Sequence, residues 1–296
     1  MGDAPRVSVL MTVFNAAPWL REAVDSVVHQ THTDWELVAI ENGCTDDSPS
    51  ILTSYADPRL RVISVRENMG RTPALRHAFG LARGEYIAVL DADDVADPAR
   101  FAKQVTFLDA NPAVTVVGSW TTRIDGLGQE FGLFTPPTDS AVLLDHLGYE
   151  NPIVHSSAMY RAAVARAVGG YPAEHPYAQD CGLWLRLAER GPIAMIAECL
   201  ASHRSLPGSM TRSKESQVMV ALDNLALLEY ACVHLPLSRV AQRRNREERT
   251  IAACRLGVAL LRTGQHGDGL AYLLSALRSD PAGVLWNRVT RGLLGT

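Results

Sequence analysis

The stretch EYIAVLDADDVADP, residues 85–98, joins an apolar segment to a cluster of acidic residues. Its apolar part, residues 86–90, has the composition of a short strand that is buried on both faces of a sheet. Asp91, Asp93 and Asp94 follow this strand directly. Because two carboxylates about 4 Å apart repel by roughly 4 kcal/mol at an effective dielectric constant of about 20, the folded protein must offset this repulsion.

Similar apolar runs recur at residues 7–14, 35–40, 60–65 and 114–120, and stretches with helical spacing lie between them at 18–31, 47–56, 72–83 and 99–110. This alternation predicts an α/β fold with a mostly parallel central sheet and helices on both faces. Gly84 stands where a helix would end in a left-handed residue. Asp97 and Pro98 have the pattern of an N-cap and a first-turn proline, so we expect a structural role for Asp97.

The alternation breaks after residue 120, and residues 121–213 mix turns with shorter elements. From residue 214 onward the pattern is almost wholly helical. We therefore expect a first domain over residues 1–213, made of the halves 1–120 and 121–213, and a C-terminal helical extension over residues 214–296.

Composition excludes several classes of function. The chain has 296 residues and a net charge of −4, whereas a nucleic-acid-binding protein would be expected to show a strongly basic face. The turn TVFNAAPW has no glycine, which argues against a dinucleotide-binding oxidoreductase, and no P-loop occurs anywhere in the sequence. The five cysteines show no C-x-x-C spacing and no signal peptide is recognisable, so we expect a reduced, cytoplasmic setting. No apolar run reaches the roughly 18 residues that span a bilayer, so any membrane contact would be peripheral at the inner face.

Three predicted strands end in polar or aromatic side chains at the edge where open α/β sheets bind ligands: Thr12 and Phe14, Glu41 and Asn42, and Asp91 with Asp93. Strand alternation puts Asp91 and Asp93 on one side and Asp94 on the other. Two carboxylates on one side suit a hard cation such as Mg²⁺ or Mn²⁺, which would also neutralise their repulsion. The alternative is a solvated strand end whose acids cap helices.

Long stretches of the chain resemble family 2 of the inverting glycosyltransferases. The similarity runs from VSVLMTVFNAAPWLREAV through ENMGRTPALRHAFGLARGEYIAVLDADDVADP, NPIVHSSAMYR and VGGYP to AQDCGLWLRLAERG, and it covers residues 6 to about 212. The resemblance implies a GT-A type fold that binds a nucleotide sugar, a divalent metal held through a D-x-D motif, and a carboxylate base for the acceptor hydroxyl. The half 1–120 would then bind the nucleotide sugar, and the half 121–213 would bind the acceptor.

The same resemblance implies roles for the residues at the sheet edge. Thr12 and Phe14 match positions that line the nucleobase pocket, Glu41 and Asn42 match an acidic pair that binds base and ribose, Arg71 approaches the diphosphate, Asp93 coordinates the metal, and Asp91 faces the ribose or supports the metal. Asn42 stands where Asp is commoner, so the preferred nucleobase stays open. A neutral amide can still donate and accept hydrogen bonds there.

Asp180 matches the catalytic base of the family's Glu-Asp motif, although Gln179 replaces the glutamate. Inversion at an anomeric carbon needs one carboxylate to accept the proton of the attacking hydroxyl, and a metal to stabilise the charge on the departing diphosphate. Because Asp180 opens an amphipathic stretch, helix N-capping is its alternative role. His155 resembles a position on the acceptor side, and a structural role is equally open. The loop 202–213 resembles a segment that closes over the diphosphate, with His203 a candidate metal ligand.

The tail resembles one tetratricopeptide repeat, with Leu256, Gly257, Leu260, Leu273, Ala276 and Pro281 on its spacing. One repeat cannot bury a continuous core by itself. We therefore expect this helical hairpin either to pack on the preceding domain or to form a homodimer contact. The arginines between residues 239 and 249 could touch anionic lipid, although a solvated helix face is the simpler interpretation.

Two other classes of function stay open. VLDADDV also fits the D-x-D-x-[TV] pattern of phosphohydrolases that form an aspartyl phosphate, with Asp91 as nucleophile, although their motif normally ends the first strand. A non-catalytic scaffold with a decayed transferase domain is the third reading. The sequence implies a nucleoside-diphosphate sugar as donor, but it names neither the sugar nor the acceptor, which could be a glycan, a lipid-linked molecule or a small molecule.

Overall fold

The structure is a computed structural model of the chain and describes residues 4–206 and 216–279. Its strands are β1 (Val7–Val13), β2 (Trp35–Asn42), β3 (Leu60–Val65), β4 (Tyr86–Val89), β5 (Val95–Ala96), β6 (Val116–Ile124), β7 (Glu130–Phe134), β8 (Met159–Arg161) and β9 (Ile193–Arg204). Its helices are α1 (Ala17–Val28), α2 (Ser48–Thr53), α3 (Arg71–Leu81), α4 (Arg100–Ala110), α5 (Ser140–Leu147), the 3-10 helix η1 (His155–Ser157), α6 (Ala162–Ala167), α7 (Gln179–Ala188), α8 (Gln217–His234), α9 (Arg239–Arg262) and α10 (His266–Ser279).

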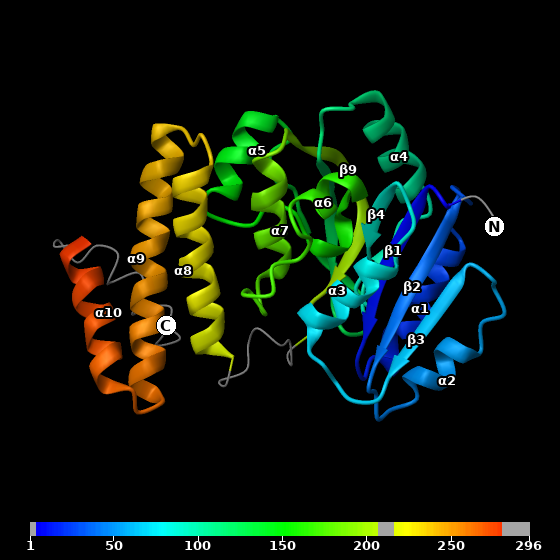
Figure 1. Cartoon of the computed structure of the whole chain (residues 1–296), viewed down its shortest axis with the longest axis horizontal. Coiled ribbons are helices and arrows are strands. Elements are labelled where there is room, and N and C mark those ends of the chain that lie inside the picture. The colour runs from blue at the N-terminus through cyan, green and yellow to red at the C-terminus, as the bar shows by residue number, and fades with distance from the viewer. Residues whose placement is uncertain (1–3, 207–215, 280–296) are drawn as a thin grey trace.

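The described strands form one mixed sheet with the order β3-β2-β1-β4-β8-β6-β9-β5, and β7 pairs with β6 (Figure 1). Strands β1 to β4 are parallel, as the alternation predicts. In the second half β8 runs antiparallel to both β4 and β6, while β6 and β9 are parallel. The α/β fold class is therefore confirmed, and the antiparallel pairs belong to the region where the sequence rhythm breaks.

The central strands are buried on both faces, which explains their nearly continuous apolar sequences. Along β1, Val9 and Met11 pack with Leu20 of α1 on one face. Leu10 packs with Leu75 of α3 on the other face. Because β1 is parallel to both of its neighbours, β2 and β4, all three strands end at the same edge of the sheet, where ligands bind in folds of this kind.

Two local expectations need correction. Gly84 does not end a helix in a left-handed conformation, since α3 ends at Leu81 and Gly84 has no positive φ. A Cβ at Gly84 would lie 2.5 Å from the backbone nitrogen of Ser8, so this glycine permits a close approach of two chain segments. Asp97 is structural, as expected, but the N-cap of α4 is Ala99, and the Asp97 side chain accepts a hydrogen bond from the Ala99 amide at 2.8 Å.

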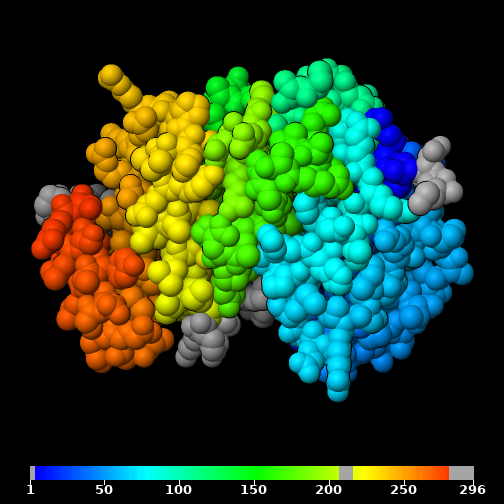
Figure 2. Space-filling model, in the orientation of Figure 1, coloured from blue at the N-terminus to red at the C-terminus, as the bar shows by residue number. Residues whose placement is uncertain are grey.

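The helices α8 and α9 pack on the α/β part of the molecule (Figures 1 and 2). Leu227 and Ala231 of α8 belong to the same buried cluster as Leu183 of α7. Asn245 of α9 is buried and donates one hydrogen bond to the Gly148 carbonyl at 2.6 Å. The start of the helical extension therefore shares a hydrophobic core with the preceding residues.

Helix α10 packs on α9 rather than on the sheet (Figure 1). At the crossing, a Cβ on Gly257 would lie 2.8 Å from the Gly269 carbonyl, so the two helices approach closely. Pro281, the last position of the repeat-like spacing, lies outside the described residues. Among residues 4–206 and 216–279, no helix combines the length and apolar composition needed to cross a bilayer.

Candidate active site

The acidic cluster forms a turn at the carboxyl end of β4. The Leu90 amide still pairs with Leu10 of β1 at 3.1 Å, and the Asp94 amide then donates to the Asp91 carbonyl at 3.1 Å. The Asp91 amide donates to the Ser156 hydroxyl of η1 at 3.0 Å. The chain therefore leaves the sheet at residue 90, and the carboxylates project from a tight turn that η1 supports.

Asp91 is held by two basic side chains from distant parts of the sequence. Arg71 Nη2, at the start of α3, lies 2.6 Å from one carboxylate oxygen of Asp91. His155 Nδ1 lies 3.2 Å from the other oxygen. Burial alone would raise the pKa of Asp91, but the charges and hydrogen bonds of Arg71 and His155 hold it well below its usual range. Much of the repulsion expected from the sequence is thus offset within the chain itself.

Asp93 has no such partner. Its carboxylate accepts no hydrogen bond from another described residue, and burial together with the charges of Asp94 and Asp91 raises its pKa to about 7. A bound cation would remove this penalty, and Mg²⁺ is commonly held by one or two carboxylates together with substrate phosphates. Within residues 4–206 and 216–279, no three His, Cys, Asp or Glu side chains gather to hold a metal alone. Asp93 therefore fits as a partial metal site, with Asp91 as the supporting carboxylate.

Asp94 fixes the turn from the opposite side. It is buried, and it accepts a hydrogen bond from the Arg204 amide at 2.7 Å, while His203 Nδ1 lies 3.3 Å away. Arg204 Nε in turn donates to the Asp93 carbonyl at 2.7 Å. The hydrogen bond and charge of Asp94 raise the pKa of His203. Asp94 therefore holds the turn to the end of β9, unlike Asp91 and Asp93. Because His203 already contacts Asp94, it is not free to act as the metal ligand that the sequence suggests.

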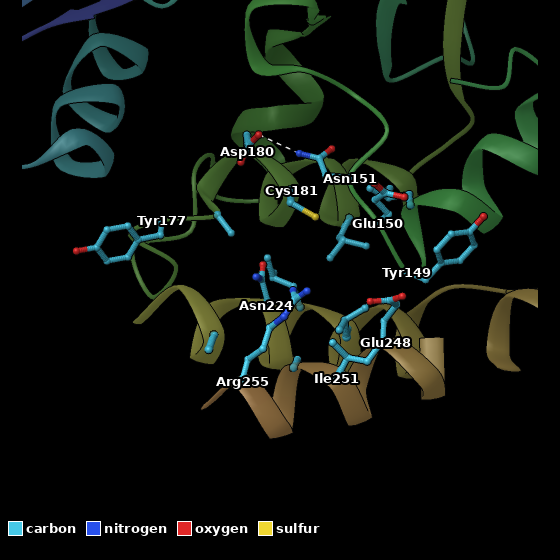
Figure 3. A pocket seen from close by; sticks show the side chains of 17 residues that line it. Tyr149, Glu150, Asn151, Tyr177, Asp180, Cys181, Asn224, Glu248, Ile251 and Arg255 are labelled. Atoms are coloured by element: carbon cyan, nitrogen blue, oxygen red, sulfur yellow. Dashed lines mark hydrogen bonds between the residues drawn. The ribbon is translucent and has the colours of Figure 1, made fainter. Parts of the chain in front are cut away.

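Asp180 lies in the first turn of α7, but it is not a helix cap. The N-cap residue of α7 is Ala178, and no side chain caps this end. The carboxylate of Asp180 instead accepts a hydrogen bond from Asn151 Nδ2 at 2.9 Å, shown as a dashed line in Figure 3. Although burial opposes it, the charges of Asp91 and Asp180 both raise the pKa of Arg71. Arg71 therefore links the acidic turn electrostatically to Asp180.

The ends of β1 and β2 lie beside this turn and hold loops in place. Glu41 is buried and accepts a hydrogen bond from the Cys44 amide at 2.6 Å. Asn42 donates to Asn68 Oδ1 at 3.0 Å and accepts from the Met69 amide at 3.1 Å. An amide at position 42 thus makes one hydrogen bond that a carboxylate could not donate.

Phe14 leaves an aromatic face open at this edge. The side chain is 47% exposed, and the neighbouring Thr12 is half-buried at the end of β1. The next residue, Asn15, has a φ of 51°, and its side chain accepts a hydrogen bond from the Thr45 amide at 2.8 Å. A left-handed residue held by a neighbouring loop fixes the direction in which the chain leaves β1.

His155 lies beside Asp91 rather than at Asp180. The ring is buried, and its Nε2 lies 3.0 Å from the Tyr171 hydroxyl, which also accepts a hydrogen bond from Tyr160 at 3.2 Å. Nδ1 lies 3.2 Å from an oxygen of Asp91 and also 3.2 Å from Arg71 Nη2, so His155, Arg71 and Asp91 form one connected polar group. His155 therefore orients Asp91, and it is not part of the cavity that Asp180 lines.

A cavity of about 330 Å³ begins at Asp180 and extends between α7 and the helices α8 and α9 (Figure 3). Asp180 and Cys181 form its wall on the α7 side. Asn224 of α8 and Arg255 of α9 form the opposite wall. Burial and the charge of Asp180 raise the pKa of the Cys181 thiol, which keeps it neutral.

Several site residues were not predicted from the sequence. Three of them contact partners that are far away in the sequence: Asn151 contacts Asp180, Arg204 contacts Asp93, and Asp223 contacts Tyr177. Asn151 lies in a quoted motif and Arg204 in the loop 202–213, but neither an amide next to a proline nor an arginine in a loop gives a sign of its partner. Ser156, which holds the Asp91 amide, lies in the same motif as Asn151.

Comparisons with known proteins identify the family and the fold. Residues 8–167 match the family described as Glycosyl transferase family 2. EpsE of Bacillus subtilis (strain 168), which is named as a glycosyltransferase, is 30% identical over 246 residues, covering 80% of this chain and 86% of the relative. The amylovoran biosynthesis glycosyltransferase AmsE of Erwinia amylovora is 27% identical over 203 residues, covering 67% of this chain and 76% of the relative.

Two solved structures share the fold. The S. aureus protein TarS (residues 1–349, in complex with UDP-GlcNAc) superposes with a TM-score of 0.65 at 15% identity, covering 94% of this chain and 92% of the other. The mannosyltransferase PcManGT of Pyrobaculum calidifontis, in complex with GDP-Man and Mn²⁺, superposes with a TM-score of 0.62 at 20% identity, covering 99% of this chain and 81% of the other.

Proposed function

The chain belongs to glycosyl transferase family 2 and is a glycosyltransferase, and we propose that it is a metal-dependent, inverting enzyme that uses a nucleoside-diphosphate sugar. The observation that carries this proposal is the arrangement around Arg71. The Arg71 side chain pairs with Asp91 at 2.6 Å and interacts electrostatically with Asp180. Asp180 lines a cavity that is large enough for an acceptor. Donor and acceptor groups can therefore meet between the acidic turn and Asp180.

The donor binds at the carboxyl ends of β1, β2 and β4. Phe14 offers its exposed ring for stacking on the nucleobase, beside Thr12, Glu41 and Asn42. Asp93, with Asp91 behind it, would hold Mg²⁺ or Mn²⁺, which stabilises the charge that grows on the departing diphosphate. Support comes from the unpartnered Asp93 carboxylate, and from the complexes of TarS with UDP-GlcNAc and of PcManGT with GDP-Man and Mn²⁺.

Asp180 acts as the base in this proposal. Its carboxylate accepts the proton of the acceptor hydroxyl while that oxygen attacks the anomeric carbon from the face opposite the diphosphate. A single displacement of this kind inverts the anomeric centre. Asn151 donates a hydrogen bond to one oxygen of Asp180 at 2.9 Å, which fixes the orientation of the carboxylate and leaves the other oxygen for the proton.

The phosphohydrolase alternative is weakened by the contacts of Asp91. Arg71 and His155 each engage one oxygen of Asp91 and hold its pKa well below the usual range, so this carboxylate is a weak nucleophile. The scaffold alternative predicts that the charged side chains of the site no longer have the positions that metal binding and proton transfer need. Asp93 instead keeps an open carboxylate, and Asp180 keeps an oriented one.

Turnover of a panel of nucleotide sugars tests the proposal. With Mn²⁺ present, the enzyme should release nucleoside diphosphate from one class of donor, and EDTA should suppress the release. Trapping of a phosphate mimic on Asp91 without nucleotide binding would favour the phosphohydrolase. Binding of no nucleotide at all would favour the scaffold.

A further inference from the structure

We propose that the cavity between α7 and the helices α8 and α9 is the acceptor site, and that it takes a neutral saccharide unit. The inference rests on the proposed role of Asp180 as the base, and it adds the C-terminal helices to the active site. A hydroxyl at the Asp180 end would reach the base, and the rest of the saccharide would lie against α8 and α9.

The position of the cavity carries the first step. Asp180 lines one end of it, and the wall opposite α7 is made by Asn224 of α8 and by Glu248 and Arg255 of α9 (Figure 3). Arg71, which pairs with Asp91 on the donor side, also interacts with the charge of Asp180. Asp180 therefore belongs to the cavity wall and is also within electrostatic reach of Arg71 on the donor side, so an acceptor in this cavity would have the base beside it.

The walls of the cavity are fixed relative to each other. Asp223 of α8 is buried and accepts hydrogen bonds from the Tyr177 amide at 2.8 Å and the Ala178 amide at 3.2 Å, just before α7 begins. Asn245 of α9 donates to the Leu228 carbonyl of α8 at 2.8 Å. A cavity bounded by such contacts is a preformed site, since its shape does not depend on the ligand.

The polar groups in the wall match a ligand with many hydroxyls. Arg255 and Glu248 make no ion pair or side-chain hydrogen bond with any residue in 4–206 or 216–279, so both are available as donor and acceptor. Asn224 can do both. Ile251 and Leu185 supply apolar surface between these groups, which suits the C–H faces of a sugar ring.

The charge of the lining favours a neutral acceptor over an acidic one. Asp180, Glu150 and Glu248 contribute three carboxylates, whereas Arg255 contributes the one guanidinium among the described lining residues. A carboxylate or phosphate on the acceptor would meet like charges in a partly enclosed space. The volume, about 330 Å³, lies at the lower end of the range for small-molecule sites, which suits a small saccharide unit.

Binding of simple saccharides tests the proposal without needing turnover. The probes are the methyl glycosides of glucose, galactose, mannose and N-acetylglucosamine, with those of glucuronate and galacturonate as acidic counterparts. Saturation-transfer NMR on the full chain should detect at least one neutral glycoside, and both acidic glycosides should bind at least about tenfold more weakly than it does. Arg255→Gln should weaken the neutral glycoside about tenfold, the loss expected for hydrogen bonds to a charged group.

Two further variants sharpen the test. Asn224→Trp places a large ring in the cavity from an exposed position and should abolish saccharide binding. Arg262→Gln is the matched control, because it makes the same change on an exposed residue of α9 outside the cavity, and binding should not change. The affinity for UDP or GDP with Mn²⁺ should stay at the wild-type value in all three variants.

The outcomes separate this proposal from the one on which it rests. Binding that is equal in wild type and Asn224→Trp, stronger binding of the acidic glycosides, or no binding of any neutral glycoside each overturns the acceptor site. If transfer is observed but the acceptor KM is unchanged in Arg255→Gln, the acceptor site is also overturned, and the proposed function stands. If saccharides bind here but no nucleotide sugar binds or reacts, the proposed function fails instead.

Discussion

Asp223→Leu is expected to damage both stability and turnover, because Asp223 ties α8 to the segment that carries Asp180. The residue is 3% exposed, and its side chain accepts hydrogen bonds from the amides of Tyr177 and Ala178, with His175 Nδ1 at 3.4 Å. Leucine keeps the branched shape at Cγ, although it is larger, and it leaves both amides without this acceptor. Each buried group left without a partner costs about 1–3 kcal/mol. Because Tyr177 and Ala178 are only half-buried, the free energy of unfolding should fall by about 2–3 kcal/mol in total.

The effect on turnover follows from position rather than charge. The two amides lie two and three residues before Asp180, so a relaxed segment displaces the carboxylate from the acceptor. A displacement of about 1 Å can cost about 10²-fold in rate, and we expect kcat to fall by roughly 10–100-fold while the donor KM changes little. Asp223→Asn is the matched control, because the amide oxygen of asparagine can accept both hydrogen bonds. Its free energy of unfolding should fall by about 1 kcal/mol or less.

Urea unfolding and steady-state kinetics measure these two effects. The free energy of unfolding should fall in the order wild type, Asp223→Asn, Asp223→Leu, and kcat should follow the same order. Wild-type stability together with wild-type kcat in Asp223→Leu would show that α8 does not hold the base segment. Loss of stability with an unchanged kcat would show that the tie is structural alone.

Three further predictions concern the sheet, the metal site and the helical extension. Glu36 is buried, which opposes ionisation, but hydrogen bonds from Arg83, Ser8 and Arg61 lower its pKa from 4.5 to about 2. The free energy of unfolding of Glu36→Gln should therefore be roughly 3 kcal/mol lower than that of the wild type at pH 7, and this difference should vanish as the pH falls from about 4.5 to about 2. Thermal unfolding at several pH values measures the difference, and a difference that does not depend on pH would contradict the prediction. Asp93→Ala should abolish the Mn²⁺-dependent part of UDP or GDP binding in calorimetry, whereas equal wild-type affinity with EDTA and with Mn²⁺ would argue against the metal site. A chain ending at residue 213 should aggregate in light scattering because it exposes the apolar surface that Leu227 and Ala231 cover, and a monomeric, equally stable product would contradict this.

Much of the fold could be predicted because its signals are local. The β-branched runs of β1 to β4 bury both faces, so their periodicity and spacing identify a parallel sheet without any knowledge of partners. Membership of glycosyl transferase family 2 was likewise readable from the quoted motifs and is confirmed. The antiparallel strand β8 was not found, since three residues carry no usable period.

The rest depends on contacts between distant residues. The negative charge of the acidic turn is partly offset by Arg71, which lies 20 residues before Asp91 in the sequence. The sequence pattern alone does not show this pairing. A glycine after a helical pattern commonly marks a helix end, which is why the sequence predicts that role for Gly84, but in the structure this glycine permits the close approach of Ser8. The sequence leaves open whether the helical extension packs on the preceding domain or on a second copy, because an apolar helix face does not specify which surface covers it; in the structure Leu227 of α8 packs with Leu183 of α7. The roles of the candidate site residues, and the boundary near residue 213, stay predictions.

The central claim is that Asp180 is the base of an inverting transfer, and Asp180→Asn tests it most directly. The substitution keeps the shape of the side chain and removes its basicity. With a donor and an acceptor identified as above, transfer should fall by about 10²–10⁴-fold while the affinity for the nucleotide stays at the wild-type value, and the wild-type product should carry an inverted anomeric centre by NMR. Transfer at a near-normal rate by Asp180→Asn, or a retained anomeric centre in the wild-type product, would contradict the account.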